Sequence, residues 1–323
     1  MEYVKLGATE IMASVAGLGC GGSSRLGKST GRSQSQSIDL VKQSLDLGVN
    51  FFDTARVYGT EEIVGLALKG EPRDSVIVST KSLVNRDGQV VSGHEIISNL
   101  EKSLKSLRMD YIDIFHLHAV LAEDYARVKE ELVPFLLRAR EDGKIRHLGI
   151  TESPPFDAKH TMLVEAFEND FPFEVIMVGF HLMHQNARSS VFPVTLRERI
   201  GTLIMFAVRS IFSNMEYLNS TLQDLFQDGL LSSNYSDVTA LEQLLVKTGG
   251  AETIIDAAYR FARHESGADV VLLGTGSCEH MKTNINSILR GPLDPEVLSV
   301  LYRDMAHLEG IGLDLPQTNQ TKK

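Results

Sequence analysis

Four side chains in the first third of the sequence are of the types that could deliver a proton to a carbonyl oxygen: Asp53, Tyr58, Lys81 and His118. Each follows or ends a short apolar run of the kind typical of a strand. A phenol beside an ammonium and an imidazole can work as a general acid. These four residues are therefore the candidate catalytic group.

The tyrosine would be the acid in this group. Its reference pKa is near 10, and a close ammonium favours the phenolate and lowers that pKa, at about 1.36 kcal/mol per unit. We expect Lys81 to supply the ammonium, Asp53 to keep Lys81 charged and in place, and His118 to polarise the same oxygen. An alkoxide that takes this proton requires hydride on its carbon. No side chain supplies hydride, so a nicotinamide cofactor is implied.

The elements that must position these residues follow from an alternation of short β-branched runs with longer segments of helical period. The eight predicted strands are Ser14–Gly19, Asn50–Asp53, Val76–Lys81, Ile112–Leu117, Ile145–Ile150, Glu174–Val178, Thr202–Phe206 and Val270–Leu273. Helical patterns follow most of them, ending with Cys278–Leu289 after the last strand. Eight such units predict a (β/α)8 TIM barrel, in which strand ends share one mouth. Three successive strands would then aim the four candidates at one place.

Three further segments refine this prediction. Residues 4–11 alternate around Gly7-Ala8 and predict an N-terminal β-hairpin that plugs the barrel's bottom. The long stretch 210–250 before the eighth strand predicts an inserted loop or extra helices over one face. No composition break marks a boundary, so we expect one domain over residues 1–323, with a polar, frayed tail at 317–323.

Composition and charge limit the kinds of partner that this protein is expected to bind. The net charge is -10 and no basic run occurs, so we expect neither nucleic acid nor a membrane surface as a partner. No apolar run approaches the roughly 18 residues of a spanning helix, and residues 1–5 lack an apolar signal core. Cys20 and Cys278 form no CxxC pattern. A cytoplasmic protein acting on a small molecule is expected, of undefined oligomeric state.

Two other architectures have a sequence basis. Gly17, Gly19 and Gly22 match the GxGxxG pattern of a Rossmann site, but Asp39 lies in a helical pattern and residues 23–36 do not continue as a phosphate-capping helix. His116 and His118 share one strand face and could bind zinc in a barrel hydrolase, for which Asp53, His181 or His184 would be the third ligand. That interpretation leaves Tyr58 and Lys81 without roles, so we favour His116 as an interior residue of the barrel.

The motif Asp53-Thr54-Ala55-x-x-Tyr58-Gly59, with Lys81 and His118, resembles the aldo-keto reductase family. Residues 143–151 look like that family's fifth strand, and 274–284 like its last βα unit. The resemblance runs from about Val4 to Ile288. It implies NAD(P)H bound without a Rossmann fold and reversible reduction of an aldehyde or ketone, with Tyr58 as the proton donor.

Several positions depart from the family pattern. Thr151-Glu152 stands where Ser-Asn usually touches the carboxamide, and Met177 where a glutamine is usual. The stacking tyrosine falls at Phe206 or Ala207. The resemblance implies NADP(H) as the cofactor. Because the usual cationic pair for its 2′-phosphate is missing from residues 274–280, NAD(H) is the alternative. The implied cofactor residues are Gly19, Asp53, Thr151, Glu152, Met177, Phe206, Arg209, Gly274, Gly276, Ser277, His280, Lys282 and Asn284.

The expected substrate pocket is open and aliphatic, and would suit a bulky or apolar carbonyl better than a small polyol. Its predicted residues are Arg56, Val57, Leu83, His116 and Ala119, together with the 210–250 segment. The altered positions Glu152 and Met177 leave one more alternative open. This is a non-redox or nucleotide-sensing member of the same barrel family, such as a cyclase, an isomerase or a regulatory subunit.

Overall fold

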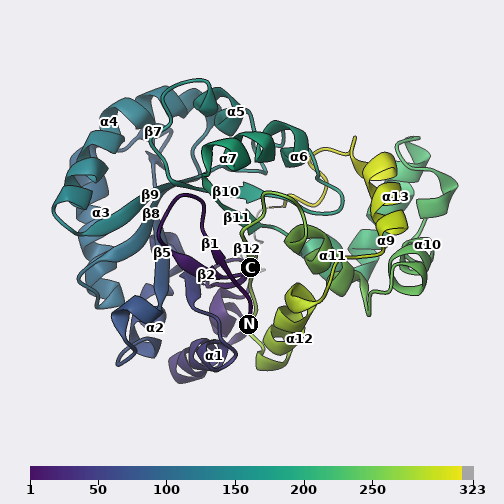
Figure 1. The fold of residues 1–323 in the computed structure, drawn as a ribbon, viewed down its shortest axis with the longest axis horizontal. Coiled ribbons are helices and arrows are strands. Elements are labelled where there is room, and N and C mark those ends of the chain that lie inside the picture. The colour runs from purple at the N-terminus through teal and green to yellow at the C-terminus, as the bar shows by residue number, and fades with distance from the viewer. Residues whose placement is uncertain (315–323) are drawn as a thin grey trace, which may run out of the picture.

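The computed structural model describes residues 1–314, and its centre is a closed barrel of parallel strands wrapped by helices (Figure 1). In chain order the strands are β3 (Ala16–Gly19), β4 (Phe51–Asp53), β5 (Ile77–Leu83), β8 (Ile112–His118), β9 (Ile145–Thr151), β10 (Val175–Gly179), β11 (Gly201–Met205) and β12 (Val270–Leu273). β12 pairs with β3 and closes the barrel. All eight predicted strands are confirmed, and the open Rossmann sheet is wrong.

Helices cover the outside of the barrel in the predicted alternation. They are α1 (Gln34–Asp46), α2 (Glu61–Ala67), α3 (Gly93–Leu107), α4 (Ala122–Glu141), α5 (Thr161–Phe167), α6 (Ala187–Ser190), α7 (Phe192–Glu198), α11 (Ile254–Arg263) and α12 (Cys278–Leu289). Local signals set several helix ends: Ser33 and Gln36 form a capping box on α1, and Ser277 caps α12. The apolar faces of these helices pack on the barrel and form the larger core.

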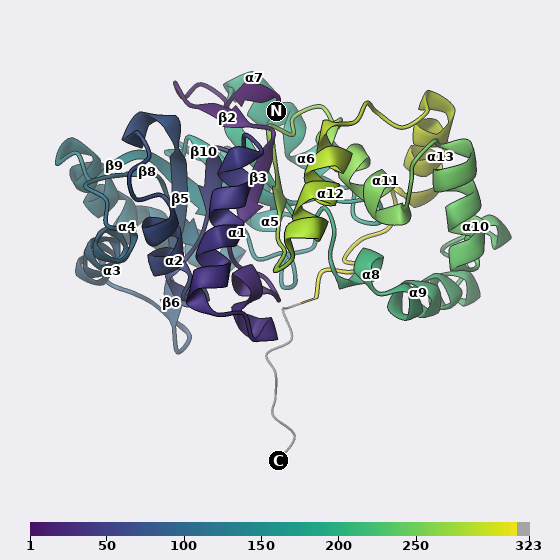
Figure 2. The same ribbon diagram turned by 90° about the horizontal axis from the view of Figure 1, so that it is seen from below.

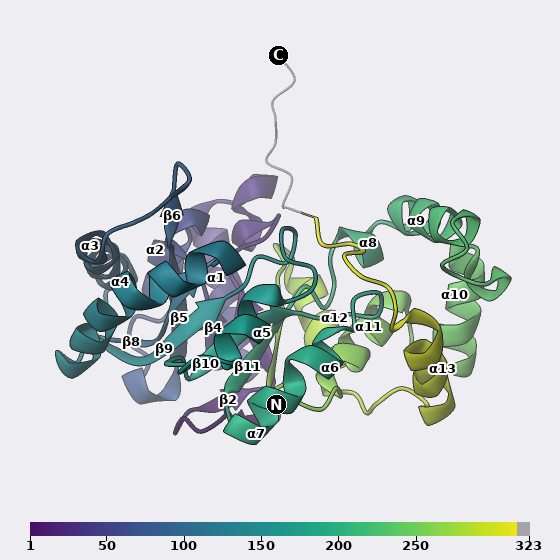
Figure 3. The same cartoon turned by 90° about the horizontal axis from the view of Figure 1, so that it is seen from above.

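The N-terminal hairpin closes the bottom of the barrel, as predicted. Strands β1 (Tyr3–Lys5) and β2 (Met12–Ser14) pair antiparallel, and Leu6 and Ile11 from their loop join the apolar cluster inside the barrel. Gly7, with φ of 56°, lies so close to β11 that an added Cβ would be 2.3 Å from the Gly201 nitrogen. Figures 2 and 3 show this hairpin at the opposite end from the small hairpin of β6 (Asn85–Arg86) and β7 (Gln89–Val90), which was not predicted.

The segment before β12 is helical, and most of it lies beside the barrel (Figures 1 and 2), while Ser210 and Ser213 of its first helix reach the mouth. It contains α8 (Ser210–Ser213), α9 (Met215–Gln227), the 3-10 turn η4 (Ser233–Tyr235), α10 (Val238–Glu242) and the π-helical turn η5 (Gln243–Thr248). The unpredicted helix α13 (Pro295–Met305) joins this lobe. No helix within residues 1–314 is long and apolar enough to span a membrane. The tail predicted at 317–323 lies outside the described residues.

Candidate active site

Asp53 and Lys81 form a buried ion pair where β4 and β5 reach the mouth. The Lys81 Nζ donates to both carboxylate oxygens of Asp53 at 2.5 Å and to the Thr54 carbonyl at 2.9 Å. The Ser79 hydroxyl, from the same strand as Lys81, donates to Asp53 Oδ1 at 2.8 Å. The two Asp53 oxygens and the Thr54 carbonyl together accept the three hydrogens of the Lys81 ammonium. Asp53 therefore holds Lys81 in place, as the sequence predicted.

Tyr58 and His118 lie beside this pair. Tyr58 ends the 3-10 turn η2 (Arg56–Tyr58) after β4, and its ring centroid is 5.4 Å from the Lys81 Nζ. The His118 ring meets the Tyr58 ring edge-on, with 5.8 Å between centroids. Gly21 makes room for the phenol, because a Cβ there would be 2.4 Å from Tyr58 Cε2. Three adjacent strands thus bring the four candidates together.

The acidity of Tyr58 differs from the prediction. Burial raises the pKa of its hydroxyl above the ordinary value of 10, and the Asp53 carboxylate and Cys20 raise it further, while Arg209 lowers it. The expected lowering by Lys81 is wrong for this arrangement, because Asp53 neutralises the ammonium at contact distance. Tyr58 therefore keeps its proton at neutral pH, as a proton donor must.

The two histidines of β8 differ in position and surroundings. Burial, and then the Lys81 charge, lower the pKa of His118 to about 3, and its enclosed Nδ1 has no hydrogen-bond partner within residues 1–314. His116 is fully buried, with its Nδ1 where a Cβ on Gly149 would come within 2.2 Å. The prediction that His116 contacts substrate is wrong, because no part of it is exposed. Over the described chain, no group of three or more His, Cys, Asp or Glu residues is arranged to hold a metal.

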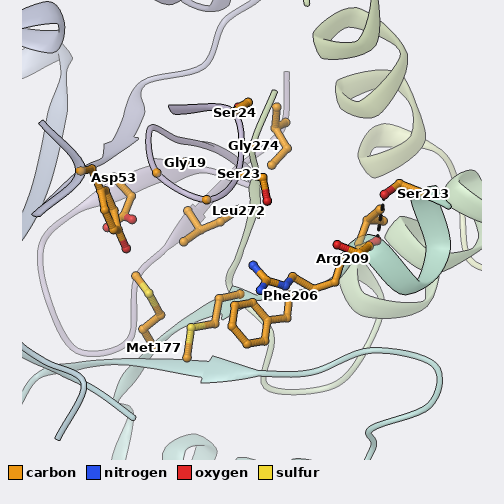
Figure 4. Close-up of a pocket in the computed structure, with 17 residues that line it drawn as sticks. Gly19, Ser23, Ser24, Asp53, Met177, Phe206, Arg209, Ser213, Leu272 and Gly274 are labelled. Atoms are coloured by element: carbon orange, nitrogen blue, oxygen red, sulfur yellow. Dashed lines mark hydrogen bonds between the residues drawn. The ribbon is translucent and has the colours of Figure 1, made fainter. Parts of the chain in front are cut away.

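A cavity of about 280 Å³ opens beside Tyr58 (Figure 4). Six predicted cofactor residues line it: Gly19, Asp53, Met177, Phe206, Arg209 and Gly274. The hydroxyls of Ser23, Ser24, Ser210 and Ser213 line it as well. Phe206 faces the cavity, whereas its neighbour Ala207 is fully buried. Of the two predicted stacking residues, only Phe206 could therefore contact a ligand in the cavity.

The character of this cavity suits a flat ring joined to phosphates. The Arg209 guanidinium lies 4.2 Å from the Phe206 ring centroid, and its Nε is enclosed without a hydrogen-bond partner in residues 1–314. An arginine with free donors is well suited to phosphate. Glycines on two walls let a ligand approach the backbone. The residues present thus fit a nicotinamide nucleotide.

Other predicted cofactor residues lie away from this cavity. Glu152 has a fully buried carboxylate, which accepts from the Gly179 backbone N–H at 2.8 Å and contacts His160 Nδ1 at 2.8 Å. Its predicted contact with the carboxamide is wrong, because both oxygens are engaged inside the protein. Thr151 lies behind the mouth, where its Oγ1 accepts from the Ala119 N–H at 2.8 Å.

Apart from Gly274, the predicted residues of the last βα unit lie at or just before the start of α12, outside the cavity's lining. Gly276 packs on the loop after β3, since a Cβ there would be 2.7 Å from the Gly27 Cα. Ser277 caps α12 by accepting from the His280 N–H at 3.4 Å. His280 and Lys282 are exposed and Asn284 is half-buried, so their cofactor role stays a prediction.

A second cavity, of about 320 Å³, lies at the rim between η2, β5 and α3. Three predicted substrate residues, Arg56, Val57 and Leu83, line it with the β6–β7 hairpin; Ala119 and His116 do not. The apolar side chains of Val57 and Leu83 are 47% and 38% exposed. The apolar side chains of this cavity therefore face solvent next to Tyr58.

Sequence reasoning missed three residues that shape this site. Ser79 bonds Asp53, Gly21 makes room for Tyr58, and Cys20 lies fully buried nearby. The sequence contained an indication of the role of Gly21, since several glycines close together after a strand often mark a place where another group approaches the backbone. Ser79 and Cys20 had none, because a buried serine or cysteine in a strand is ordinary.

The fold and site can be compared with known proteins. The profile of the Aldo/keto reductase family matches residues 17–302. Aldo-keto reductase YhdN of Bacillus subtilis (strain 168) is 30% identical over 297 residues, 85% of each chain. L-galactose dehydrogenase of Arabidopsis thaliana is 32% identical over 160 residues, 48% of this chain and 49% of its own.

The solved structures agree in fold. The holo form of aldo-keto reductase AKR11C1 from Bacillus halodurans has a TM-score of 0.70 to this chain at 21% identity, and 99% of each chain is covered. The family match spans most of the chain and contains all four candidate catalytic residues. The chain therefore belongs to the aldo/keto reductase family.

Proposed function

We propose that this protein is an NAD(P)H-dependent oxidoreductase that reversibly reduces an aldehyde or ketone to an alcohol. The observation that carries the proposal is the position of Tyr58, beside the Lys81–Asp53 pair and His118 and on the wall of the 280 Å³ cavity. A protonated phenol at this place can serve a carbonyl oxygen that enters from the mouth.

The residues would act in sequence on that oxygen. The neutral His118 imidazole would offer a hydrogen bond and orient the carbonyl, since its lowered pKa keeps it uncharged at pH 7. The bound nicotinamide would supply hydride to the carbonyl carbon. Tyr58 would transfer its proton to the oxygen. The positive charge of Arg209 would stabilise the phenolate left behind, since that of Lys81 is matched by Asp53. In the reverse direction the same phenolate would accept the proton.

The cofactor would occupy the cavity beside Tyr58. Phe206 would contact the nicotinamide ring, and Arg209 would bind a phosphate with both charge and hydrogen bonds. Gly276, Ser277, His280, Lys282 and Asn284 at the start of α12 would lie near the adenosine end. NADP(H) is the preferred cofactor in this proposal and NAD(H) the alternative.

The substrate would enter past the rim cavity. Exposed Val57 and Leu83 favour a bulky or apolar carbonyl over a small polyol. Two relatives bear names of different substrates, L-galactose dehydrogenase and methylglyoxal reductase DkgB, so the relatives do not narrow the choice.

Two measurements test this proposal. Titration with NADPH and NADH, followed by quenching of protein fluorescence, should show saturable binding of at least one of them. A stopped-flow absorbance trace over aldehydes, ketones, sugars and quinones should then show the reduced nicotinamide being consumed. Failure to bind either nucleotide would refute the proposal. Binding without oxidation across the whole panel would favour a non-redox or sensing role, which the apolar Met177 in the cavity keeps open.

A further inference from the structure

A second ion pair, which the sequence did not indicate, lies just behind the mouth. Glu152 follows β9, and His160 lies eight residues later at the start of α5; both side chains are fully buried. Besides His160, the Glu152 carboxylate accepts the backbone N–H of Gly179 at the end of β10. One carboxylate thus ties the ends of two neighbouring strands to the loop between them.

The hydrogen bonds define the charge of His160. Its Nδ1 faces the Glu152 carboxylate at 2.8 Å, and its Nε2 faces the Oδ1 of Asn186 at 3.1 Å. The Asn186 amide cannot be reversed, because its Nδ2 donates to the Ala158 carbonyl at 2.6 Å. Both ring nitrogens therefore face acceptors and both must carry hydrogen. His160 is an imidazolium.

The other groups around His160 are consistent with a single charged ring. Burial alone would lower the pKa of His160. The negative charges of Glu152 and Asp157 outweigh burial, so the pKa is raised. The His184 ring packs 5.1 Å away and is neutral, since burial lowers its pKa to about 2. His181 lies behind His184 and is also neutral. Lys159 is largely exposed and faces Glu309 instead.

The pair connects directly to the backbone of the catalytic group. Thr151, adjacent to Glu152, receives two hydrogen bonds from the residues that follow His118. Its Oγ1 accepts from the Ala119 N–H at 2.8 Å, and its carbonyl accepts from the Val120 N–H at 2.9 Å. Ala119 is held in the left-handed region, with φ of 57°, which a non-glycine residue adopts only when its surroundings enforce it.

We propose that Glu152 and His160 are positioning residues, whose buried imidazolium–carboxylate pair fixes the end of β9 so that Thr151 can hold the backbone after His118 at the angle needed for catalysis. The role of His118 in this inference rests on the proposed function. Loss of a proton from His160 would remove the positive charge opposite Glu152 and leave one ring nitrogen facing an acceptor without a hydrogen. Turnover should therefore fall as the pH rises through the raised pKa of His160.

The chain supplies a matched control at the other end of the same strand. His147 Nδ1 contacts Glu174 Oε1 at 2.8 Å, and the other Glu174 oxygen accepts the Leu148 N–H at 3.2 Å. This second pair repeats the geometry of the first but lies at the barrel's bottom, partly exposed. Substitutions in the His147–Glu174 pair therefore show what the loss of a His–Glu pair from β9 does when the pair is far from the mouth.

The experiment compares Glu152→Gln and His160→Gln with Glu174→Gln and His147→Gln. We expect the mouth variants to lose about tenfold or more in kcat, with KM and cofactor affinity within about twofold. His160→Gln should also lose the alkaline fall in the pH profile of kcat. The bottom variants should stay within about twofold of the wild type and keep its pH profile. Mouth variants that behave like the bottom variants would overturn the proposal.

A second measurement does not depend on turnover, and its first part needs no variant. Nitrogen-15 NMR of the imidazole rings in the wild-type protein should show one buried histidine with both nitrogens protonated at pH 7.5, and Glu152→Gln should shift the His118 signals. A neutral His160 ring would overturn the proposal, and so would His118 signals that Glu152→Gln leaves in place. If the wild type binds nucleotide but oxidises none, the proposed function fails while this NMR test still decides the pairing.

Discussion

The two ends of the barrel contain similar buried charged residues in different surroundings. At the bottom, Asp113 accepts from Arg73 at 2.6 Å and from the Val78 N–H at 2.9 Å, and Tyr111 lies between two arginines. At the mouth, Asp53 and Lys81 are paired just as tightly, but His118 Nδ1 and Arg209 Nε stay enclosed without partners in the described chain. Arg73 Nε at the bottom is also enclosed without a partner among the described residues, so unpaired atoms alone do not distinguish the two ends. The mouth differs because Asp53, Tyr58 and Arg209 together line one cavity there.

The largest difference should come from the two tyrosines. Tyr58→Phe removes the proposed proton donor and should lower kcat by about 10²–10⁴-fold, the usual contribution of a general acid. Cofactor affinity should change little, because only one oxygen is lost. Tyr111→Phe, which removes a hydroxyl that accepts from Arg146 at 2.6 Å, should leave kcat within about twofold. Steady-state kinetics of both variants measure the contrast, and equal losses would remove Tyr58 from its proposed role.

The two buried carboxylates offer the next contrast. Lys81→Met leaves Asp53 as an unpaired buried charge and should cost about 3–5 kcal/mol of unfolding free energy. It should also abolish most turnover. Arg73→Met does the same to Asp113, although Arg73 is partly exposed and Arg146 lies 3.5 Å from the other oxygen, so the loss should be smaller.

Urea denaturation and kinetics together test this pair of variants. A stable Lys81→Met protein with normal turnover would contradict both the energetic and the catalytic argument. Arg73→Met should keep its kcat once the folded fraction is taken into account. A selective loss of turnover in Arg73→Met would show that the bottom is coupled to the chemistry.

Two glycines give a smaller contrast of the same kind. Gly21→Ala would place a methyl carbon 2.4 Å from the Tyr58 ring, so we expect the phenol to shift and kcat to fall about 10–100-fold. Gly201→Ala would meet Leu6 of the plug at 2.6 Å and should lower the melting temperature without lowering kcat. Thermal melts and kinetics on both variants show whether Gly21→Ala affects kcat and Gly201→Ala affects stability. An unchanged kcat in Gly21→Ala would contradict the argument that Gly21 is needed for the position of Tyr58.

Sequence patterns predicted the barrel well, for a physical reason. Each parallel strand is buried on both faces, so it appears as a continuous apolar run, and the ends of these runs located Asp53, Lys81 and His118. The same logic placed the plug, because Leu6 and Ile11 alternate with polar neighbours. Helix α13 was missed because it packs on the lobe and follows no strand of the barrel.

The details of the site were less predictable, because they depend on which partner a charge finds. Glu152 appeared to face the cofactor from its place after a strand, but His160 and Gly179 hold it inside. Lys81 appeared to acidify Tyr58, but its charge is matched by Asp53. Sequence spacing identifies which strand end a residue occupies; it does not show which of several nearby groups it contacts.

The last contrast is a pH dependence of stability that distinguishes the two ends. Burial lowers the pKa of His118 and of His181 to about 3 and that of His184 to about 2, against an ordinary value of 6.5. A lowered histidine pKa means that the unfolded chain binds the extra proton. Stability should therefore fall as the pH drops below about 6.5, by about 1.4 kcal/mol per pH unit for each such ring. Asp269, whose pKa burial raises to about 6, acts with the opposite sign but is a single group.

The bottom pair titrates in a different window. The His147 side chain and backbone bonds lower the pKa of Glu174 below 4.5, so its contribution is present above pH 4.5 and disappears only below that value. Between about pH 4.5 and 6.5 the slope should therefore report the mouth-side histidines. His184→Phe removes one of these rings and should flatten the slope measured by urea denaturation, whereas Glu174→Gln should leave it unchanged. A slope that responds to Glu174→Gln and not to His184→Phe would reverse the division between the two ends.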